Sequence, residues 1–292
     1  MAPSDLTPGA LEAWVCGEAG LSAPVWASMC HHQGLWINRQ RWVGQAVAAG
    51  SEVVAYAFLS EPEPIEITEK SVLAAGELVA IDKPAWICTQ GTRASDRLSV
   101  EAQVRRLLGR PELVAAHRLD RETSGVLLFS APGPAAAALH AQFRAHAVEK
   151  IYHARVERPL EAPVTVEGPL VRVLHAHHSL FALQPGAVGL HSRTHFAPLG
   201  APLVEARPET GRTHQIRAHL AWLGHPIAGD TLYNRPWSPG DAQRTLLHAA
   251  RIRLRFGGET VEFEAPQPID FVDELADVDA GSPPTDQAAA PR

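Results

Sequence analysis

The segment that most constrains this chain runs from His117 to Phe129. It places one carboxylate, Asp120, between two arginines, follows it with the turn-forming run Thr-Ser-Gly, and ends in the apolar run Val-Leu-Leu-Phe. A short apolar run that begins at turn residues is typical of a buried strand. The pattern therefore predicts a rigidly held, ionised aspartate at a site that handles an anionic partner.

The bulk composition favours an intracellular globular protein. The chain has 292 residues, of which 46% are hydrophobic, and no stretch approaches the 18 apolar residues that span a membrane. Residues 1–10 lack the basic start and apolar segment of a secretory signal, and three cysteines match no zinc or disulfide pattern. We expect a cytoplasmic monomer with free thiols and no membrane partner.

The charge is distributed unevenly along the chain. Residues 1–100 hold 6 Lys/Arg against 11 Asp/Glu, residues 101–255 hold 19 against 12, and residues 256–292 hold 1 against 9. Attraction to phosphate acts over roughly 8–10 Å, so the local sign matters more than the net charge of -6. The basic middle favours a nucleic-acid partner, although arginine clusters are also typical of solvated surfaces.

The order of elements predicts an α+β fold with a mixed, largely antiparallel sheet, flanking helices and a small N-terminal domain, because several strands follow one another without a helix between them. The expected strands are 78–81, 126–129, 152–156, 203–206, 252–256 and 261–263, and the expected helices are 99–108, 134–147 and 213–223. The expected division is an N-terminal region at 1–60, a linker at 61–70 that contains Glu-Pro-Glu-Pro, a main domain at 71–270, and a disordered acidic tail at 271–292.

The N-terminal region resembles the closing half of an S4-type RNA-binding module, with short strands separated by turns. Such modules place a basic helix on RNA, whereas residues 11–40 contain Arg39 as their only Lys or Arg. Two interpretations stay open, a degenerate S4-like module and a plain structural extension.

A second segment, Gly211 to Leu220, predicts a rigid helix that carries a cation. Thr213 can cap this helix, and one apolar stripe follows the helical period, at Ile216, Leu220 and Leu223. Arg217 lies at the edge of that stripe, on the side shared with His214. A carboxylate in a dry pocket needs a neighbouring cation to stay ionised, and Arg217 is the best candidate to accompany Asp120.

A third segment, Lys150 to Val156, has the alternation of a strand, in which Tyr152 would ordinarily be a half-buried sheet aromatic. In this order, the three segments resemble the pseudouridine synthases of the large-subunit ribosomal A type (the RluA-like family), over roughly residues 73–268. The resemblance implies that residues 71–270 form a catalytic domain that isomerises uridine in structured rRNA or tRNA without a cofactor. Asp120 attacks the uridine, the glycosidic bond breaks, the base rotates, and a C–C bond forms through C5. Whether the attack is at C1' or at C6 stays open.

The resemblance also implies roles for further residues. Arg217 pairs with Asp120, Tyr152 packs on the uracil and takes a proton, and Arg118 fills the space that the uridine leaves, unless it contacts phosphate instead. Lys83 ends the family's first motif as an RNA-facing framework lysine, and Leu247 lines the base pocket. The expected substrate-contacting residues are Arg118, Lys83, His117, Thr123, Arg212, His214, Gln215 and Leu247.

Other classes of function fit the sequence less well. The histidines lack Glu or Cys at metal-ligand spacing, and His214 and His219, five apart on a helix, face different sides, so no metal is expected. A glycoside or nucleoside hydrolase that uses Asp120 lacks an obvious second carboxylate. The main alternative is a catalytically silent RNA-binding protein on the same scaffold, which the presence of Asp120, Tyr152 and Arg217 disfavours.

Overall fold

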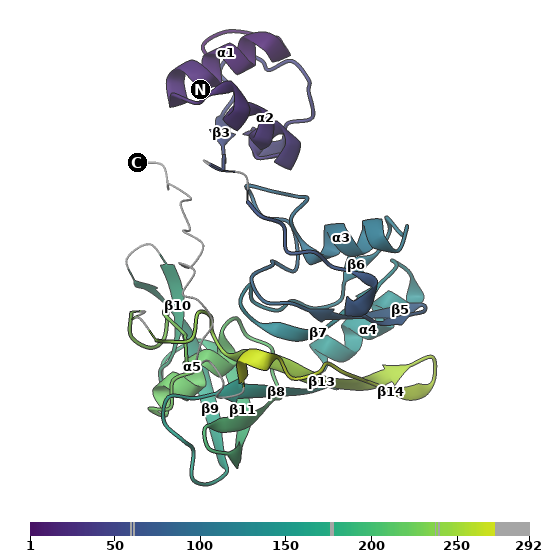
Figure 1. The fold of residues 1–292 in the computed structure, drawn as a ribbon, viewed down its shortest axis with the longest axis vertical. Coiled ribbons are helices and arrows are strands. Elements are labelled where there is room, and N and C mark those ends of the chain that lie inside the picture. The colour runs from purple at the N-terminus through teal and green to yellow at the C-terminus, as the bar shows by residue number, and fades with distance from the viewer. Residues whose placement is uncertain (59, 61, 176–177, 237, 239, 272–292) are drawn as a thin grey trace. The chain divides into compact units, whose positions relative to one another are not determined.

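The computed structural model describes residues 1–58, 60, 62–175, 178–236, 238 and 240–271, and these residues form two units (Figure 1). Of the described residues, one unit contains 1–66 and 88–110, and the other contains 67–87 and 111–271. The boundary at Glu66 lies inside the expected linker, 61–70. Residues 88–110, expected in the main domain, cluster with the N-terminal region instead. The expected tail lies outside the described residues except for Phe271.

The smaller unit begins with two helices that the sequence patterns did not indicate, α1 (Pro8–Ala19) and α2 (Ala23–His32). Thr7 caps α1 through its side chain, and Gly20 ends it in the left-handed conformation. A three-stranded antiparallel sheet follows in the order β2-β1-β3. Its strands are β1 (Leu35–Ile37), β2 (Gln40–Arg41) and β3 (Val53–Ala55), and the unit also holds α3 (Val100–Leu107).

The larger unit is built on an eleven-stranded mixed sheet, and this confirms the predicted α+β class. The path is β10-β9-β11-β12-β8-β13-β7-β5-β4, with β14 beside β13 and β6 beside β7, and every pairing is antiparallel except β13 with β7. The strands are β4 (Val72–Ala75), β5 (Leu78–Lys83), β6 (Val114–Ala115), β7 (Ser124–Ser130), β8 (Glu149–Arg155), β9 (Val164–His175), β10 (His178–Leu183), β11 (Leu190–Gly200), β12 (Leu203–Pro208), β13 (Leu247–Phe256) and β14 (Glu259–Glu264).

Two helices and two 3-10 turns accompany this sheet. Helix α4 (Pro134–Arg144) packs against β13, and helix α5 (Gln215–Trp222) covers β10, β11 and β12 (Figure 1). The turns are η1 (Glu69–Ser71) and η2 (Ile269–Phe271). The all-apolar run of β7 is buried at every residue, as its sequence predicted, and Val126 and Leu128 join Leu139 of α4 in a hydrophobic core of this unit.

Strand β13 brings two of the three sequence segments together, and α5, which carries the third, packs on β10, β11 and β12. Strand β13 pairs with β8 on one side, where Ala249 lies opposite Tyr152, and with β7 on the other, where His248 lies opposite Ser124. Gly125 allows the second pairing, since a Cβ atom there would lie 2.2 Å from the Ala249 carbonyl oxygen. The loop that carries Asp120 therefore enters the sheet beside the strand that carries Leu247, one strand away from Tyr152.

Candidate active site

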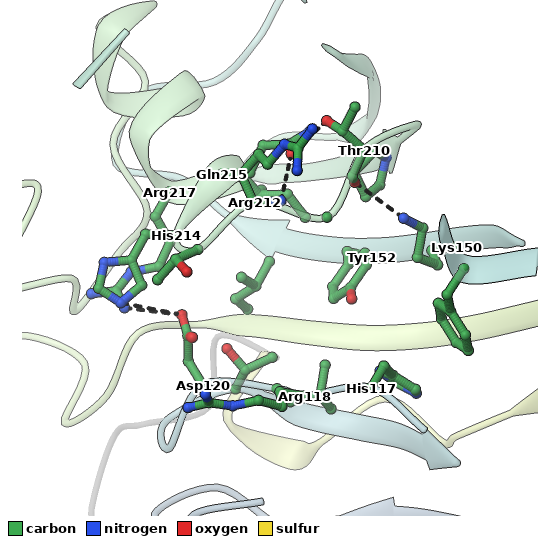
Figure 2. Close-up of a pocket in the computed structure, with 18 of the residues that line it drawn as sticks. His117, Arg118, Asp120, Lys150, Tyr152, Thr210, Arg212, His214, Gln215 and Arg217 are labelled. Carbon is green, nitrogen blue, oxygen red and sulfur yellow. Dashed lines mark hydrogen bonds and ion pairs between the residues drawn. The ribbon is translucent and has the colours of Figure 1, made fainter. Parts of the chain in front are cut away.

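A cleft with a volume of about 730 Å³ lies where these segments meet (Figure 2). Its size falls within the range of roughly 300–1,000 Å³ that is usual for small-molecule and cofactor sites. Every residue predicted to act on or contact the substrate lines this cleft, apart from Lys83. The lining residues of the described chain include a single acidic one, Asp120.

Asp120 and Arg217 form an ion pair across the cleft. Arg217 Nη1 lies 3.2 Å from Asp120 Oδ2, and the side chain of Asp120 is 33% exposed whereas that of Arg217 is 5% exposed (Figure 2). The pairing that the resemblance implied is thus present in the geometry. The carboxylate is accessible from the cleft, and the cation beside it is withdrawn into the protein.

A second carboxylate, Asp230, fixes the orientation of Arg217. Its two oxygens accept hydrogen bonds from Arg217 Nε at 2.7 Å and from Nη2 at 2.8 Å, and its Oδ1 also accepts from the backbone of Leu232 and Tyr233. Burial opposes the charge of Arg217, but the bonds to Asp230 and the charges of Asp230 and Asp120 raise its pKa above the ordinary value. Arg217 is therefore a permanent cation with one nitrogen, Nη1, directed at Asp120.

His214 approaches Asp120 from the start of α5. Its Nε2 lies 3.8 Å from Asp120 Oδ2, and its Nδ1 shares a hydrogen bond of 3.0 Å with the Tyr233 hydroxyl. Burial lowers the pKa of His214, so the neutral ring is favoured. The predicted cap was wrong, because His214 and not Thr213 is the N-cap residue, in a left-handed conformation (φ 56°) and without a side-chain cap.

Tyr152 faces the cleft from β8, between Asp120 and Lys150 in the view of Figure 2. Burial and the charge of Asp120 raise the pKa of its hydroxyl well above the ordinary value. The side chain therefore presents a neutral phenol to the cleft across the whole range of pH in which RNA is stable to handle.

Lys83 was predicted to face RNA, but its side chain does not line the cleft. The side chain is completely buried at the end of β5. Its Nζ donates to the carbonyl oxygens of Pro84 at 2.9 Å, Ile87 at 2.8 Å and Arg121 at 3.1 Å. Three backbone carbonyls satisfy all three donors of the ammonium group. Lys83 thereby fastens the turn after β5 to the loop that carries Asp120.

Other predicted residues line the cleft and also hold its walls. Gln215 is buried and bonds Thr210, Thr194 and the backbone of Arg193 and Arg212, which ties α5 to the neighbouring strand. Thr123 and Leu247 are buried, and the backbone N–H of Thr123 donates to the Asp120 carbonyl. His117 stacks on Phe143 and accepts a hydrogen bond from the Leu128 N–H, and its burial lowers its pKa to about 3.

Two absences hold within the residues that the structure describes. No group of three His, Cys, Asp or Glu side chains there is arranged to hold a metal ion. No helix there is long and apolar enough to cross a membrane.

Comparison with known proteins places this geometry in a family. The profile of the family described as RNA pseudouridylate synthase matches residues 77–222. A ribosomal large subunit pseudouridine synthase D of Zymomonas mobilis is 32% identical over 232 residues, which is 72% of each chain. The chain belongs to the RNA pseudouridylate synthase family. It is therefore a pseudouridine synthase, an enzyme of the isomerase class.

Further relatives and structures agree with this assignment. A tRNA pseudouridine synthase C of Salmonella typhimurium is 37% identical over 212 residues, covering 64% of this chain and 81% of its own length. The solved structure of human RNA pseudouridylate synthase domain containing 1 superposes with a TM-score of 0.55 at 28% identity, and covers 72% of this chain and 87% of its own. The domain containing 4 protein has the same TM-score at 24% identity and supports the fold alone.

Sequence reasoning did not single out several residues of this synthase's cleft. Asp230 lies 13 residues after Arg217, beyond the end of α5, and spacing does not reveal such a pairing. Lys150 was noticed only as part of the Tyr152 pattern. His140, Arg144 and His146 line the cleft from the end of α4 and the turn after it, where no motif marked them.

Proposed function

We propose that this synthase is of the large-subunit ribosomal A type and isomerises a specific uridine in structured rRNA or tRNA, with Asp120 as its nucleophile. The observation that carries the proposal is the exposed Asp120 carboxylate, held against the buried Arg217 cation in a cleft that contains no other acid among the described residues. Relatives named for rRNA and for tRNA make both RNA classes candidates.

In the proposed reaction, an extruded uridine enters the cleft and Asp120 attacks it at C1' or at C6. The N1–C1' bond breaks, the uracil rotates, and a C5–C1' bond forms. The bond between Asp120 and the nucleoside breaks to restore the carboxylate, C5 loses its proton, and N1 takes up a proton. Arg217 keeps the attacking carboxylate ionised and oriented. Tyr152 packs on the uracil ring and takes part in removing the C5 proton, for which its own phenolic proton must first be lost.

The remaining residues hold the substrate in this proposal. Arg118 is exposed at the mouth of the cleft and fills the space in the RNA that the extruded uridine leaves. Leu247 supports the base, and Arg212 lies on the opposite wall with its Nε bound to the His191 carbonyl. We further propose that residues 71–270 supply catalysis, apart from 88–110, and that the enzyme acts as a cytoplasmic monomer.

Replacing Asp120 by asparagine tests the proposal most directly. Asn keeps the shape of the side chain and removes the nucleophile, so tritium release from C5-labelled uridine in RNA should be abolished while RNA binding stays close to wild type. Glu262→Gln, a carboxylate-to-amide change on β14 outside the cleft, is the matched control. Asp120→Asn activity within about tenfold of wild type would remove Asp120 from the nucleophile role.

A further inference from the structure

The cleft continues past Tyr152, away from the Asp120–Arg217 pair. Figure 2 shows Lys150 and Thr210 on the opposite side of Tyr152 from Asp120 and His214. His140, Arg144 and His146 line the same cleft from the end of α4 and the turn that follows. We call these four residues, His140, Arg144, His146 and Lys150, the basic end of the cleft.

No protein carboxylate neutralises the two cations of the basic end in the described part of the chain. Neither Arg144 nor Lys150 has an acidic partner at ion-pair distance there, and Asp120 is the single acid among the lining residues. Arginines elsewhere are commonly paired, for example Arg105 with Glu101 at 2.9 Å and Arg244 with Asp270 at 2.6 Å. In a chain with a net charge of -6, unpaired cations gathered in a cleft indicate an anionic ligand.

Lys150 is the anchor of the basic end. Its Nζ donates to the Thr210 carbonyl at 3.1 Å, and no other hydrogen-bond partner for this nitrogen lies within the described residues. An ammonium group carries three donors, so two are available to a ligand. Burial lowers the pKa of Lys150 to about 8, which shows that its charge lacks compensation inside the protein.

The surroundings of Lys150 are rigid and leave room for a ligand. The lysine extends from β8, and the Thr210 hydroxyl that flanks it donates to the buried Gln215 side chain at 2.7 Å. Gly211 follows and has no side chain, whereas a Cβ atom there would lie 4.0 Å from Nζ, in van der Waals contact with it. The stacked rings of His117 and Phe143 form the adjoining wall, and the neutral His117 adds no charge of its own.

We propose that the basic end binds the phosphodiester of a nucleotide next to the target uridine, with Lys150 and Arg144 as its donors. The proposal rests on the proposed function, since it places the uracil at Asp120 and Tyr152 and the neighbouring backbone on the far side of Tyr152. Phosphate is the anion that an RNA strand presents at each nucleotide, and lysine and arginine are its usual partners. The contact would hold an extruded uridine in register and would offset part of the cost of its extrusion.

The test combines changes in the RNA with changes in the protein. RNA that the wild-type enzyme modifies is prepared with a single neutral methylphosphonate linkage at each position flanking the target uridine in turn. For wild type, one of these linkages should weaken RNA binding and raise KM by about tenfold or more, with kcat at saturation nearly unchanged. In Lys150→Met and in Arg144→Gln, the same linkage should cost much less, because its partner is already gone.

Controls separate this contact from general electrostatics and from misfolding. Arg253→Gln removes an exposed arginine of β13 that does not line the cleft, and it should leave the full penalty of the neutral linkage in place. Arg144 is exposed and without a protein partner in the described residues, so Arg144→Gln should fold normally. The slope of log affinity against log salt should decrease by about 0.7–0.9 for each contact removed.

The outcomes are distinct. The neutral linkage could raise KM by the same factor in Lys150→Met, Arg144→Gln and wild type at every position. That result would overturn the phosphate contact and leave the synthase function intact. If wild type modifies no RNA, the proposed function fails instead. The phosphate contact then fails with it, because no target uridine exists for the neutral linkages to flank.

Discussion

The two ends of the cleft treat charge in opposite ways. At one end, Arg217 is 5% exposed and its three nitrogens are all committed, two to Asp230 and one to Asp120. At the other end, Lys150 donates one hydrogen bond, to the Thr210 carbonyl oxygen, and Arg144 has no partner within the described residues. A group that stabilises a transition state lowers the barrier most when the protein orients it before the substrate binds. A group that binds the substrate needs hydrogen-bond donors that no protein atom already occupies. The difference supports the proposals that place chemistry at one end and RNA binding at the other.

A second buried arginine reinforces the organised end from behind. Arg244 Nε and Nη2 bind the two oxygens of Asp270 at 2.6 and 2.8 Å, and its Nη1 donates to the Glu122 carbonyl at 3.1 Å. The Glu122 carboxylate in turn accepts from the backbone and side chain of Thr245. The loop that carries Asp120 is therefore held at the two residues that follow the aspartate, by Lys83 at Arg121 and by Arg244 at Glu122.

The largest expected effect comes from removing the cation at the organised end. Arg217→Met should lower kcat by about 10²–10³-fold, the usual cost of losing one oriented charged donor at a reacting group. The salt slope of RNA binding should stay nearly constant, because Arg217 is committed to two carboxylates and not to phosphate. Tritium release and a salt titration of binding measure the two quantities. A variant that binds RNA worse in proportion to its lost activity would make Arg217 a phosphate contact and would erase the contrast between the two ends.

A more moderate loss should follow when Arg217 is kept but its orientation is not. Asp230→Asn leaves the buried guanidinium with a neutral neighbour, and we expect a loss of about 3–5 kcal/mol in the free energy of unfolding. At temperatures where the variant is folded, kcat should fall less than in Arg217→Met, with KM nearly unchanged, because the cation still reaches Asp120 but is no longer held there. Chemical denaturation and steady-state kinetics provide the two measurements.

The exposed pair of Arg235 and Asp241 supplies the control for this prediction. Asp241→Asn makes the same chemical change in a pair that solvent screens, and should alter neither the unfolding midpoint nor kcat. If Asp230→Asn behaved like Asp241→Asn, Asp230 would not position Arg217.

The sequence predicted the structural features that depend on neighbouring residues. Three elements were identified from the apolar run of β7, the alternation around Tyr152 and the helical period around Arg217. Each of these patterns depends only on residues that are close in the sequence. The strands β9 to β11 were missed. Gly168 and Pro169 lie inside β9, and a Gly-Pro pair favours a turn when only the sequence is considered.

Partnerships between distant residues were the part that sequence could not supply. Lys83 was expected to face RNA because it ends a strand in a motif. Its ammonium group instead donates to three carbonyl oxygens, one of which belongs to a loop 38 residues away. Arg144 and Lys150 are close in the sequence, but no motif indicated that the end of α4 and the start of β8 line the same cleft. Asp120, Tyr152 and Arg217 were grouped by resemblance. The register of β13 with its two neighbours brings Asp120 close to Tyr152, and the packing of α5 on β10, β11 and β12 adds Arg217.

The smallest expected effect is a pH dependence of RNA binding at the basic end of the cleft. Burial lowers the pKa of Lys150 to about 8, and the ammonium form is the one that binds phosphate. RNA affinity should therefore decrease as pH rises from 7.5 to 9.5, a window above the ordinary range of histidine, in which the arginines of the cleft stay charged. The neighbouring His117 and Tyr152 do not titrate there, since their pKa values are displaced below and above it.

The stability of the RNA-free enzyme should respond to the same titration with the opposite sign. Between the folded pKa of about 8 and the ordinary value of 10.5, the unfolded chain binds more protons at Lys150 than the folded protein does. Unfolding stability contributed by this residue therefore rises with pH across that interval, while RNA affinity falls. Lys150→Met should lose both trends, and Arg253→Gln should keep them. Binding curves and denaturant titrations at matched ionic strength would measure both trends. If wild type and Lys150→Met showed the same trends, the charge of Lys150 would be compensated in the free protein, and the basic end would be as fully paired as the Asp120 end.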